Sequence, residues 1–292
     1  MKLLIYDDYK FGVLKGDRVA DVTGTLQHVG IKPAQTLMEE IIEDFDFFRP
    51  KFEQATANQE GVPLASVKVR PPLPRPHNIL CAFANYQDRD QPSTAPLDFF
   101  YKGSTGIIGP GDTVEIPDVP EALVHQAEPE LGYVIGKKVK HVSAADALDC
   151  VFGYLNFVDV SNRAVPNRRT TFMQKGMDTY APIGPVIVTK DEIADPQNLQ
   201  VKLWLNGELK QDYNTAAMTH SVAAQIAWLT QYIALMPGDV LACGTHHVGL
   251  SPINDGDKVD VEVEGLERLS FSVRSLGERK TAEWGPPGTR QG

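Results

Sequence analysis

The sequence has few cysteines and no excess of positive charge, and both shortages narrow the classes of protein to which it can belong. The only cysteines in 292 residues are Cys81, Cys150 and Cys243. An odd number in apolar surroundings predicts reduced core residues and a cytoplasmic location. Lysine and arginine total 28 against 38 aspartate and glutamate residues, a net charge of -10. We therefore expect no nucleic-acid partner, because such a protein needs surplus cations to neutralise phosphates.

Long apolar runs and nucleotide motifs are also missing. No run reaches the roughly 18 apolar residues of a membrane span, so no membrane partner is expected. The apolar run near the N-terminus, Leu3–Tyr6, is too short for a signal peptide, and acids follow it at once. Neither a G-x-G-x-x-G nor a Walker motif occurs, which argues against a nucleotide site.

Local patterns predict a small N-terminal domain. Three short apolar runs are typical of strands: Leu3–Tyr6, Phe11–Leu14 and Val19–Val22. The longer segment Pro33–Gln54 has apolar residues at helical spacing. The segment Pro71–Pro76 contains four prolines, which lack the amide donor and so form a stiff linker. We therefore expect a small N-terminal α/β domain over residues 1–70 and a second domain over 71–292.

The second domain is predicted to be rich in strands. Many short apolar segments are separated by Gly, Pro and Asp turns, and only two helices are expected, Ala144–Asp149 capped by Ser143, and Ser221–Tyr232. Few helices among many strands favour an α+β fold over a βαβ repeat. The tail over 279–292 is expected to be poorly ordered or to pack on a neighbouring subunit.

Two glutamates in the segment 127–136 are the most informative feature of the chain. Glu128 and Glu130 are separated by one residue, so on a strand both side chains face the same way, about 7 Å apart. Two carboxylates that close repel unless a proton or a cation lies between them. A hard divalent cation such as Mg²⁺ suits such oxygen ligands. The alternative is a solvated edge strand that happens to carry two glutamates.

A third acid, Asp159, lies alone in an apolar, β-rich segment. Burying a carboxylate without a partner costs several kcal/mol, so Asp159 needs a metal, an arginine or a hydrogen-bond network. It could complete a metal site with the two glutamates, or pair with Arg163, or cap a turn. Since the set is all oxygen, a zinc site is disfavoured. His125 could orient a metal ligand without binding the metal itself, or it could simply lie on the strand surface.

Five separated segments, in their order and spacing, resemble the fumarylacetoacetate hydrolase family. The resemblance extends from Pro76 to Val273. It implies an α+β fold whose C-terminal domain is a mixed β-roll or β-sandwich, a homodimer, and Mg²⁺ as cofactor with Mn²⁺ or Ca²⁺ as alternatives. The segments that carry it are Ala127–Gly136, Gly153–Arg163, Phe172–Pro185, Asn206–Asp212 and Leu235–Thr245.

The resemblance also implies roles for individual residues. The metal ligands would be Glu128, Glu130 and Asp159. Lys175 matches the family's lysine beside the metal, which would hold a substrate carboxylate or stabilise an enolate; its alternative role is to balance the acids. Thr245 matches the threonine of the family's Gly-Thr-Pro turn. Substrate contacts are expected from Thr245, Gln211 and Tyr86.

One departure from the family pattern falls in the segment Asn85–Pro92. Many family hydrolases have a histidine and a glutamate there that activate water, whereas this chain has Arg89 and Pro92. Arginine stays protonated and cannot be a general base. Arg89 could instead bind a second substrate carboxylate, because its planar fork suits that geometry. Asp88 and Asp90 are weaker candidates for the base.

The second departure is His246, which replaces the family's proline. A histidine beside Thr245 can carry a proton near neutral pH and could take over the role of the base. The alternative is that His246 and His247 form hydrogen bonds within their own turn.

The resemblance implies a Mg²⁺-dependent hydrolase that cleaves a C–C bond in a 2-oxo acid, acylpyruvate-like or β-diketo, by way of a metal-stabilised enolate. The alternative is a lyase of the same family, a decarboxylase, dehydratase or isomerase acting on a 2-oxo or sugar-derived acid. A metal-binding protein without turnover is a third hypothesis. In each enzymatic case the partner is a small-molecule 2-oxo acid.

Overall fold

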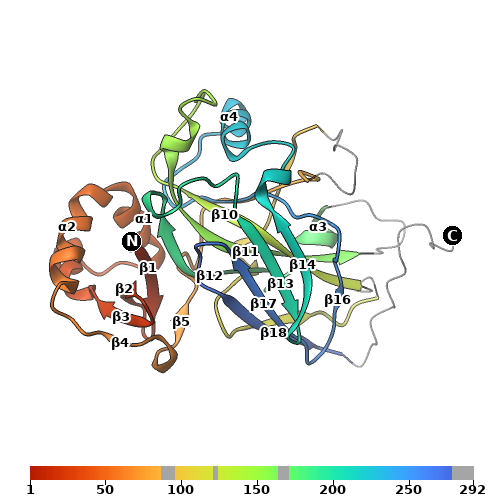
Figure 1. Cartoon of the computed structure of the whole chain (residues 1–292), viewed down its shortest axis with the longest axis horizontal. Helices are drawn as coiled ribbons and strands as arrows, with labels where there is room; N and C mark the ends of the chain where they lie inside the picture. The colour runs from red at the N-terminus through yellow and green to blue at the C-terminus, as the bar shows by residue number, and fades with distance from the viewer. Residues whose placement is uncertain (87–95, 121–123, 164–170, 278–292) are drawn as a thin grey trace.

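Two β-sheets that pack against each other carry most of the secondary structure (Figure 1). The computed structural model describes residues 1–86, 96–120, 124–163 and 171–277. Within these ranges the mixture of sheets and few helices confirms the predicted α+β class. None of the described helices is long and apolar enough to cross a membrane.

The larger sheet runs in the order β4-β3-β2-β1-β12-β11-β10-β15-β6-β7, with β5, β8 and β16 pairing alongside β1, β12 and β10. Its longest strands, β10 and β11, are neighbours and are buried along almost their whole length. The strands are β1 (Lys2–Tyr6), β2 (Lys10–Lys15), β3 (Arg18–Asp21), β4 (Val62–Pro63), β5 (Val69–Arg70), β6 (Ile79–Ala82), β7 (Phe99–Tyr101), β8 (Ile107–Ile108), β10 (Val124–Ile135), β11 (Val151–Arg163), β12 (Ala181–Thr189), β15 (Val240–Ala242) and β16 (Pro252–Ile253).

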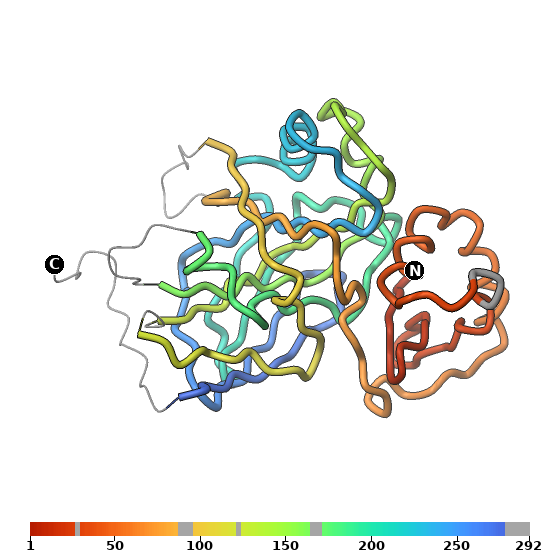
Figure 2. The backbone as a smooth tube through the Cα atoms, turned by 180° about the vertical axis from the view of Figure 1, so that it is seen from behind, coloured from red at the N-terminus to blue at the C-terminus, as the bar shows by residue number. Residues whose placement is uncertain are grey.

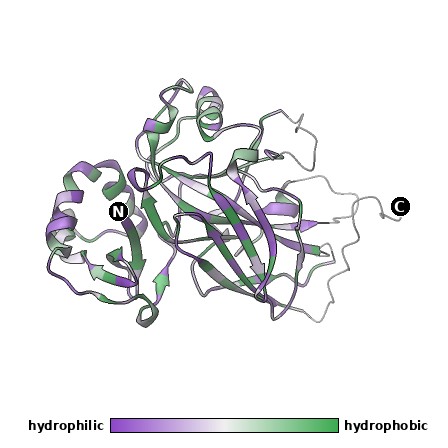
Figure 3. Ribbon diagram, in the orientation of Figure 1, coloured by the Kyte–Doolittle hydropathy of each residue, from purple (hydrophilic) through white to green (hydrophobic). Residues whose placement is uncertain are grey.

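The smaller sheet covers one face of β10 and β11. Its order is β14-β13-β17-β18-β9. Every second residue of β18 is buried, as the period of a strand requires, and Phe271 packs in one cluster with Val158 and Val160 of β11. Figure 3 shows that the outer strand β14 is mostly hydrophilic, as expected for a sheet edge. The strands are β9 (Thr113–Ile116), β13 (Gln200–Leu205), β14 (Glu208–Asn214), β17 (Lys258–Val263) and β18 (Leu269–Ser275).

The three predicted N-terminal strands are present as β1, β2 and β3, but they do not form a separate sheet. β1 pairs antiparallel with β12, where Leu3 lies opposite Ile187, so the N-terminal strands extend the larger sheet. Figure 2 shows this part of the chain, in red and orange, beside the rest of the molecule. The predicted linker Pro71–Pro76 contains no helix or strand. The domain limits 1–70 and 71–292 stay a prediction.

The region Pro33–Gln54 is helical as predicted, but it forms two helices and not one. α1 (Ala34–Glu43) ends and α2 (Phe45–Thr56) begins at Asp44, whose φ of -116° and ψ of 43° lie outside the helical region. The Asp44 amide closes α1 on the Glu40 carbonyl, and the Asp44 carbonyl accepts from the first turn of α2. One residue thus satisfies the backbone groups of both helix ends.

Of the two helices predicted in the second domain, one is present in the structure and the other is not. α4 (Val222–Tyr232) begins as expected at Ser221, whose hydroxyl accepts from the Ala224 amide at 3.2 Å. The helix predicted over Ala144–Asp149 is wrong: the segment forms a turn closed by Ser143 and Asp146, followed by a short 3-10 helix. The hydrogen bonds between Ser143 and Asp146 close this turn and compete with an α-helix in the segment.

The remaining helical segments are short. α3 (Thr171–Lys175) contributes a side chain to the candidate site. The 3-10 helices are η1 (Thr23–Val29), η2 (Leu64–Ser66), η3 (Ser104–Gly106), η4 (Ala147–Cys150), η5 (Lys190–Glu192) and η6 (Thr215–Ala217).

Candidate active site

The pairing of β10 with β11 brings three carboxylates together. Glu128 lies directly opposite Asp159 in the antiparallel ladder, and Glu130 follows two residues later on the same face of β10. All three side chains are buried, and one ligand atom from each lies within 4.8 Å of the others. The alternative of a solvated edge strand is therefore wrong.

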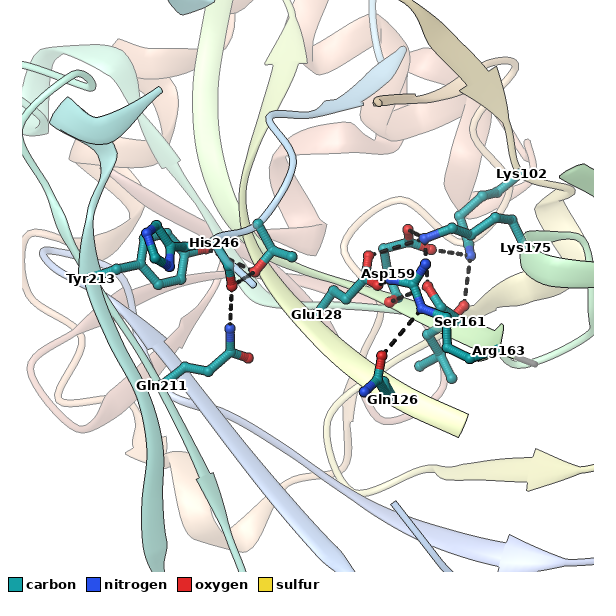
Figure 4. Close-up of polar contacts among 12 residues, drawn as sticks. Lys102, Gln126, Glu128, Asp159, Ser161, Arg163, Lys175, Gln211, Tyr213 and His246 are labelled. Carbon is teal, nitrogen blue, oxygen red and sulfur yellow. Dashed lines mark hydrogen bonds and ion pairs between the residues drawn. The ribbon is translucent and has the colours of Figure 1, made fainter. Parts of the chain in front are cut away.

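Three cations neutralise this cluster (Figure 4). Lys175 Nζ donates to Glu128 Oε2 at 3.0 Å and also forms a close ion pair with Asp159 Oδ2. Lys102 Nζ donates to Asp159 Oδ1 at 2.5 Å. Arg163 forms a close ion pair with Glu128 Oε1. Buried charges need such partners, since an isolated ion in a protein interior is strongly disfavoured.

The pKa values of two of these carboxyls are shifted in opposite directions. Burial, reinforced by the negative charge of Asp159, raises the pKa of Glu130 to about 8. Burial also acts to raise the pKa of Asp159, but Lys102 and Lys175 outweigh it and lower that pKa below its usual value. Adding positive charge to the cluster therefore favours the fully ionised set of carboxylates.

The cluster fits a hard divalent cation. Its donor atoms are all carboxylate oxygens, which Mg²⁺ and Mn²⁺ accept, and they converge from two adjacent, rigid strands. Pro129, between the two glutamates, is tolerated because β15 and β16 pair with β10 only on either side of it, at 132–134 and 125–126.

A second polar cluster, formed by β14 and the 243–248 segment, adjoins the carboxylates. Gln211 Nε2 donates to the His246 carbonyl at 2.6 Å, and the Tyr213 hydroxyl lies 3.3 Å from Thr245 Oγ1. The His246 ring stacks on Tyr213 with centroids 5.8 Å apart, and Tyr86 meets Tyr213 edge-on at 5.1 Å. The four residues predicted for this region therefore lie in one contiguous group, namely Tyr86, Gln211, Thr245 and His246.

The Gly244 amide joins the two clusters, because it donates to Glu130 Oε2 at 2.6 Å. On the outer side, His246 and Tyr213 border a cavity of about 430 Å³ that also includes Lys210. His246 Nδ1 accepts from the Val248 amide at 3.2 Å, the within-turn hydrogen bond considered as its alternative role. The other ring nitrogen is not used in that bond.

Replacing Gly244 with alanine is expected to weaken metal binding about tenfold, because the amide at Glu130 must move. Gly244 has a φ of 85°, and an added Cβ would lie 3.2 Å from the Asn85 Cβ. The measurement is titration with Mn²⁺ followed by electron paramagnetic resonance. Gly256→Ala is the control, since its φ of 83° gives the same strain with nothing within 4 Å. Equal effects of the two variants on Mn²⁺ affinity would contradict the role of this amide.

The structure also places other residues that the sequence singled out. His125 is fully buried, with Nδ1 2.7 Å from the Tyr180 hydroxyl, so its interpretation as strand surface is wrong. The alternative in which Asp159 pairs with Arg163 is wrong, because Asp159 pairs with two lysines and Arg163 binds Glu128. Burial raises the pKa of the Cys243 thiol well above its usual value, which disfavours a nucleophile there. A further group lies outside the described residues: Asp88, Arg89, Asp90, Pro92 and the tail 279–292.

Sequence reasoning missed two residues that shape the site. Lys102 directly follows the aromatic strand β7 and reaches Asp159 from a segment far away in the sequence, so only the three-dimensional pairing reveals it. Tyr213 could have been found, because it lies two residues after Gln211 and therefore on the same face of β14.

A buried all-oxygen carboxylate site on an α+β fold defines a class of candidate metal-dependent enzymes, and comparisons identify the family. The family model described as fumarylacetoacetate (FAA) hydrolase C-terminal matches residues 78–274. The chain is 37% identical over 217 residues to the mitochondrial oxaloacetate tautomerase Fahd2a of Rattus norvegicus, covering 70% of this chain and 69% of that protein. This chain therefore belongs to the fumarylacetoacetate hydrolase family.

Solved structures agree with this assignment. A maleylpyruvate hydrolase from Sphingobium sp. SYK-6, in complex with manganese(II) and pyruvate, matches with a TM-score of 0.84 at 33% identity, covering 94% of this chain and 99% of that one. A 2-hydroxyhepta-2,4-diene-1,7-dioate isomerase from Mycobacterium marinum matches with a TM-score of 0.73 at 28% identity, covering 95% and 100%. The relatives named are thus hydrolases, isomerases and tautomerases.

Proposed function

We propose that this protein is a divalent-metal-dependent enzyme that interconverts the keto and enol forms of a 2-oxo acid. The observation that carries the proposal is the buried triad of Glu128, Glu130 and Asp159 with the Lys175 ammonium beside it. A divalent cation held by the three carboxylates would polarise the 2-oxo group as a Lewis acid.

The remaining roles belong to side chains of this chain. Lys175 is proposed to stabilise negative charge as it develops on the enol oxygen, because an ammonium acts strongly on a nearby charge in a buried site. Thr245, Gln211 and Tyr86 are proposed to hold the substrate. His246 is proposed to carry the proton, since its ring borders the outer cavity next to this cluster.

Keto–enol conversion is favoured over hydrolysis by two observations. It needs a proton carrier but no activated water, and Arg89 and Pro92 replace the pair that would activate water. The similarity to an oxaloacetate tautomerase points the same way. Hydrolysis of an acylpyruvate-like acid is the second candidate, supported by the similarity to maleylpyruvate hydrolase over 94% of the chain.

Metal removal is expected to stop turnover. The enzyme with Mg²⁺ should accelerate exchange of the oxaloacetate C3 protons in D₂O, EDTA should abolish the acceleration, and excess Mg²⁺ should restore it. Proton NMR follows the exchange, with Mg²⁺ alone and the Asp159→Asn variant as controls, because free metal also promotes enolisation. Water-consuming cleavage of maleylpyruvate without exchange would establish the second candidate instead. Enzymatic acceleration of the exchange that persists in EDTA would refute the metal role.

The ion, the assembly and the compartment stay predictions. Mg²⁺ is proposed, although the hydrolase relative was solved with manganese(II). A homodimer in the cytoplasm is likewise proposed, and the printed name of the rat relative places that protein in mitochondria.

A further inference from the structure

Every oxygen of Glu128 and Asp159 contacts a cationic side chain. Arg163 contacts Glu128 Oε1, and Lys102 contacts Asp159 Oδ1. The other two oxygens, Glu128 Oε2 and Asp159 Oδ2, share a single partner, the Lys175 ammonium. One atom can bridge two oxygens only if they point toward the same place. The oxygens that converge are therefore those bound by Lys175.

A metal ion that binds both carboxylates needs such a converging pair. Its bonds to oxygen are about 2.0–2.1 Å for Mg²⁺, shorter than the 3.0 Å between Lys175 Nζ and Glu128 Oε2. An ion bound to these two oxygens would consequently lie within a few ångströms of the ammonium. Two positive charges this close repel, so the metal and the Lys175 ammonium would compete for the same two oxygens.

Lys102 occupies a different position. Its Nζ donates to Asp159 Oδ1, the oxygen that Lys175 does not bind, and also to the Val160 carbonyl at 3.2 Å. Its side chain is 1% exposed, compared with 6% for Lys175. Held by a backbone acceptor and fully enclosed, Lys102 fixes the orientation of the Asp159 carboxylate without entering the space between the two acids.

We propose that Lys175 is a resident cation that leaves the carboxylates when the metal binds, and that Lys102 is a positioning residue that stays. The inference rests on the metal site of the proposed function, but not on which reaction is catalysed. The two lysines, which bind the same carboxylate, then have opposite effects on metal affinity.

The test measures Mn²⁺ affinity of the full chain by electron paramagnetic resonance. Lys175→Met should bind Mn²⁺ about tenfold more tightly than the wild type, because a competing charge a few ångströms away is removed. Lys102→Met should bind it roughly 10–100-fold more weakly, the usual effect of losing a group that orients a ligand. Lys258→Met, which removes the same charge at an exposed position, should bind like the wild type.

Unchanged or weaker Mn²⁺ binding by Lys175→Met would overturn the inference while leaving the metal site intact. Failure of the wild type itself to bind Mn²⁺ would refute the metal site of the proposed function, and the inference with it. If Lys102→Met does not fold, Lys175→Arg supplies the comparison: it retains the positive charge and should not bind Mn²⁺ more tightly than the wild type. Tighter binding by Lys175→Arg would show that charge competition is not the cause.

Oxalate provides a second readout that a purely structural lysine would not change. In the wild type, the displaced Lys175 ammonium gains an oxalate carboxylate as a new partner, so oxalate should strengthen Mn²⁺ binding. Because coupling between ligands is reciprocal, Mn²⁺ should strengthen oxalate binding by the same factor. In Lys175→Met this factor should fall severalfold. An equal factor in both proteins would contradict the displacement of Lys175.

Discussion

Replacing Asp159 with asparagine is expected to lower kcat/KM by about three orders of magnitude and to abolish measurable Mn²⁺ binding. Asp159 supplies one of the three carboxylates, and Lewis-acid catalysis contributes several kcal/mol to the barrier, at about 1.4 kcal/mol for each factor of ten. The amide has nearly the same shape, so the backbone pairing with Glu128 should persist. Steady-state kinetics and Mn²⁺ titration measure the two losses.

The same substitution is expected to destabilise the fold. Lys102 would keep its charge in a buried position where the carboxylate 2.5 Å away has lost its own. Breaking a buried ion pair by removing one partner costs about 3–5 kcal/mol. Adding Lys102→Met to Asp159→Asn removes the uncompensated charge and should restore most of the free energy of unfolding. It should not restore activity, because the metal ligand is still missing.

Urea denaturation in EDTA separates these effects, since no metal then contributes to stability. Glu115→Gln is the matched control, because it removes a carboxylate from the exposed ion pair with Arg274 and should change stability by less than about 1 kcal/mol. A double variant no more stable than Asp159→Asn would show that Lys102 does not depend on Asp159 for its charge. Full Mn²⁺ affinity in Asp159→Asn would remove the residue from the metal site.

The sequence predicts the shared orientation of the two glutamates well, because that orientation depends on short-range geometry. The spacing of Glu128 and Glu130 defines a shared face of one strand. Asp159 could be recognised as a buried acid, but the register that sets it opposite Glu128 depends on the pairing of two long strands. Resemblance to the family implies that link independently of the structure. The pairing confirms that the three acids meet.

Long-range contacts are the part that sequence reasoning could not supply. Lys102 reaches Asp159 across 57 residues of sequence, and no local pattern distinguishes it from a surface lysine. The pairing of β1 with β12 likewise depends on an edge that the N-terminal segment alone does not reveal. The predicted helix boundaries near Asp44 and Ser143 differ from the structure for another reason. Local hydrogen bonds, made by the Asp44 backbone and by the Ser143 side chain, override the helical periodicity of the sequence there.

Replacing Asn156 with leucine is expected to reduce the free energy of unfolding by about 3–5 kcal/mol, a large part of the roughly 5–15 kcal/mol available to a domain. This fully buried side chain of β11 donates to the Gly184 carbonyl at 3.0 Å and the Glu267 carbonyl at 2.6 Å. Its oxygen accepts from the Val263 amide at 2.8 Å. Leucine fills a similar volume but leaves these backbone groups without partners. Urea denaturation measures the loss.

The position of Asn156 explains why the loss should be large. β11 belongs to the larger sheet, whereas Val263 ends β17 of the smaller one, so a single amide fixes the two sheets relative to each other. Asn198→Leu makes the same chemical change at an exposed turn and should alter stability by less than about 0.5 kcal/mol. If Asn156→Leu were as stable as this control, apolar packing alone would hold the sheets together. Because Asp159 lies three residues further along β11, a shift between the sheets should also weaken Mn²⁺ binding in the folded fraction of Asn156→Leu.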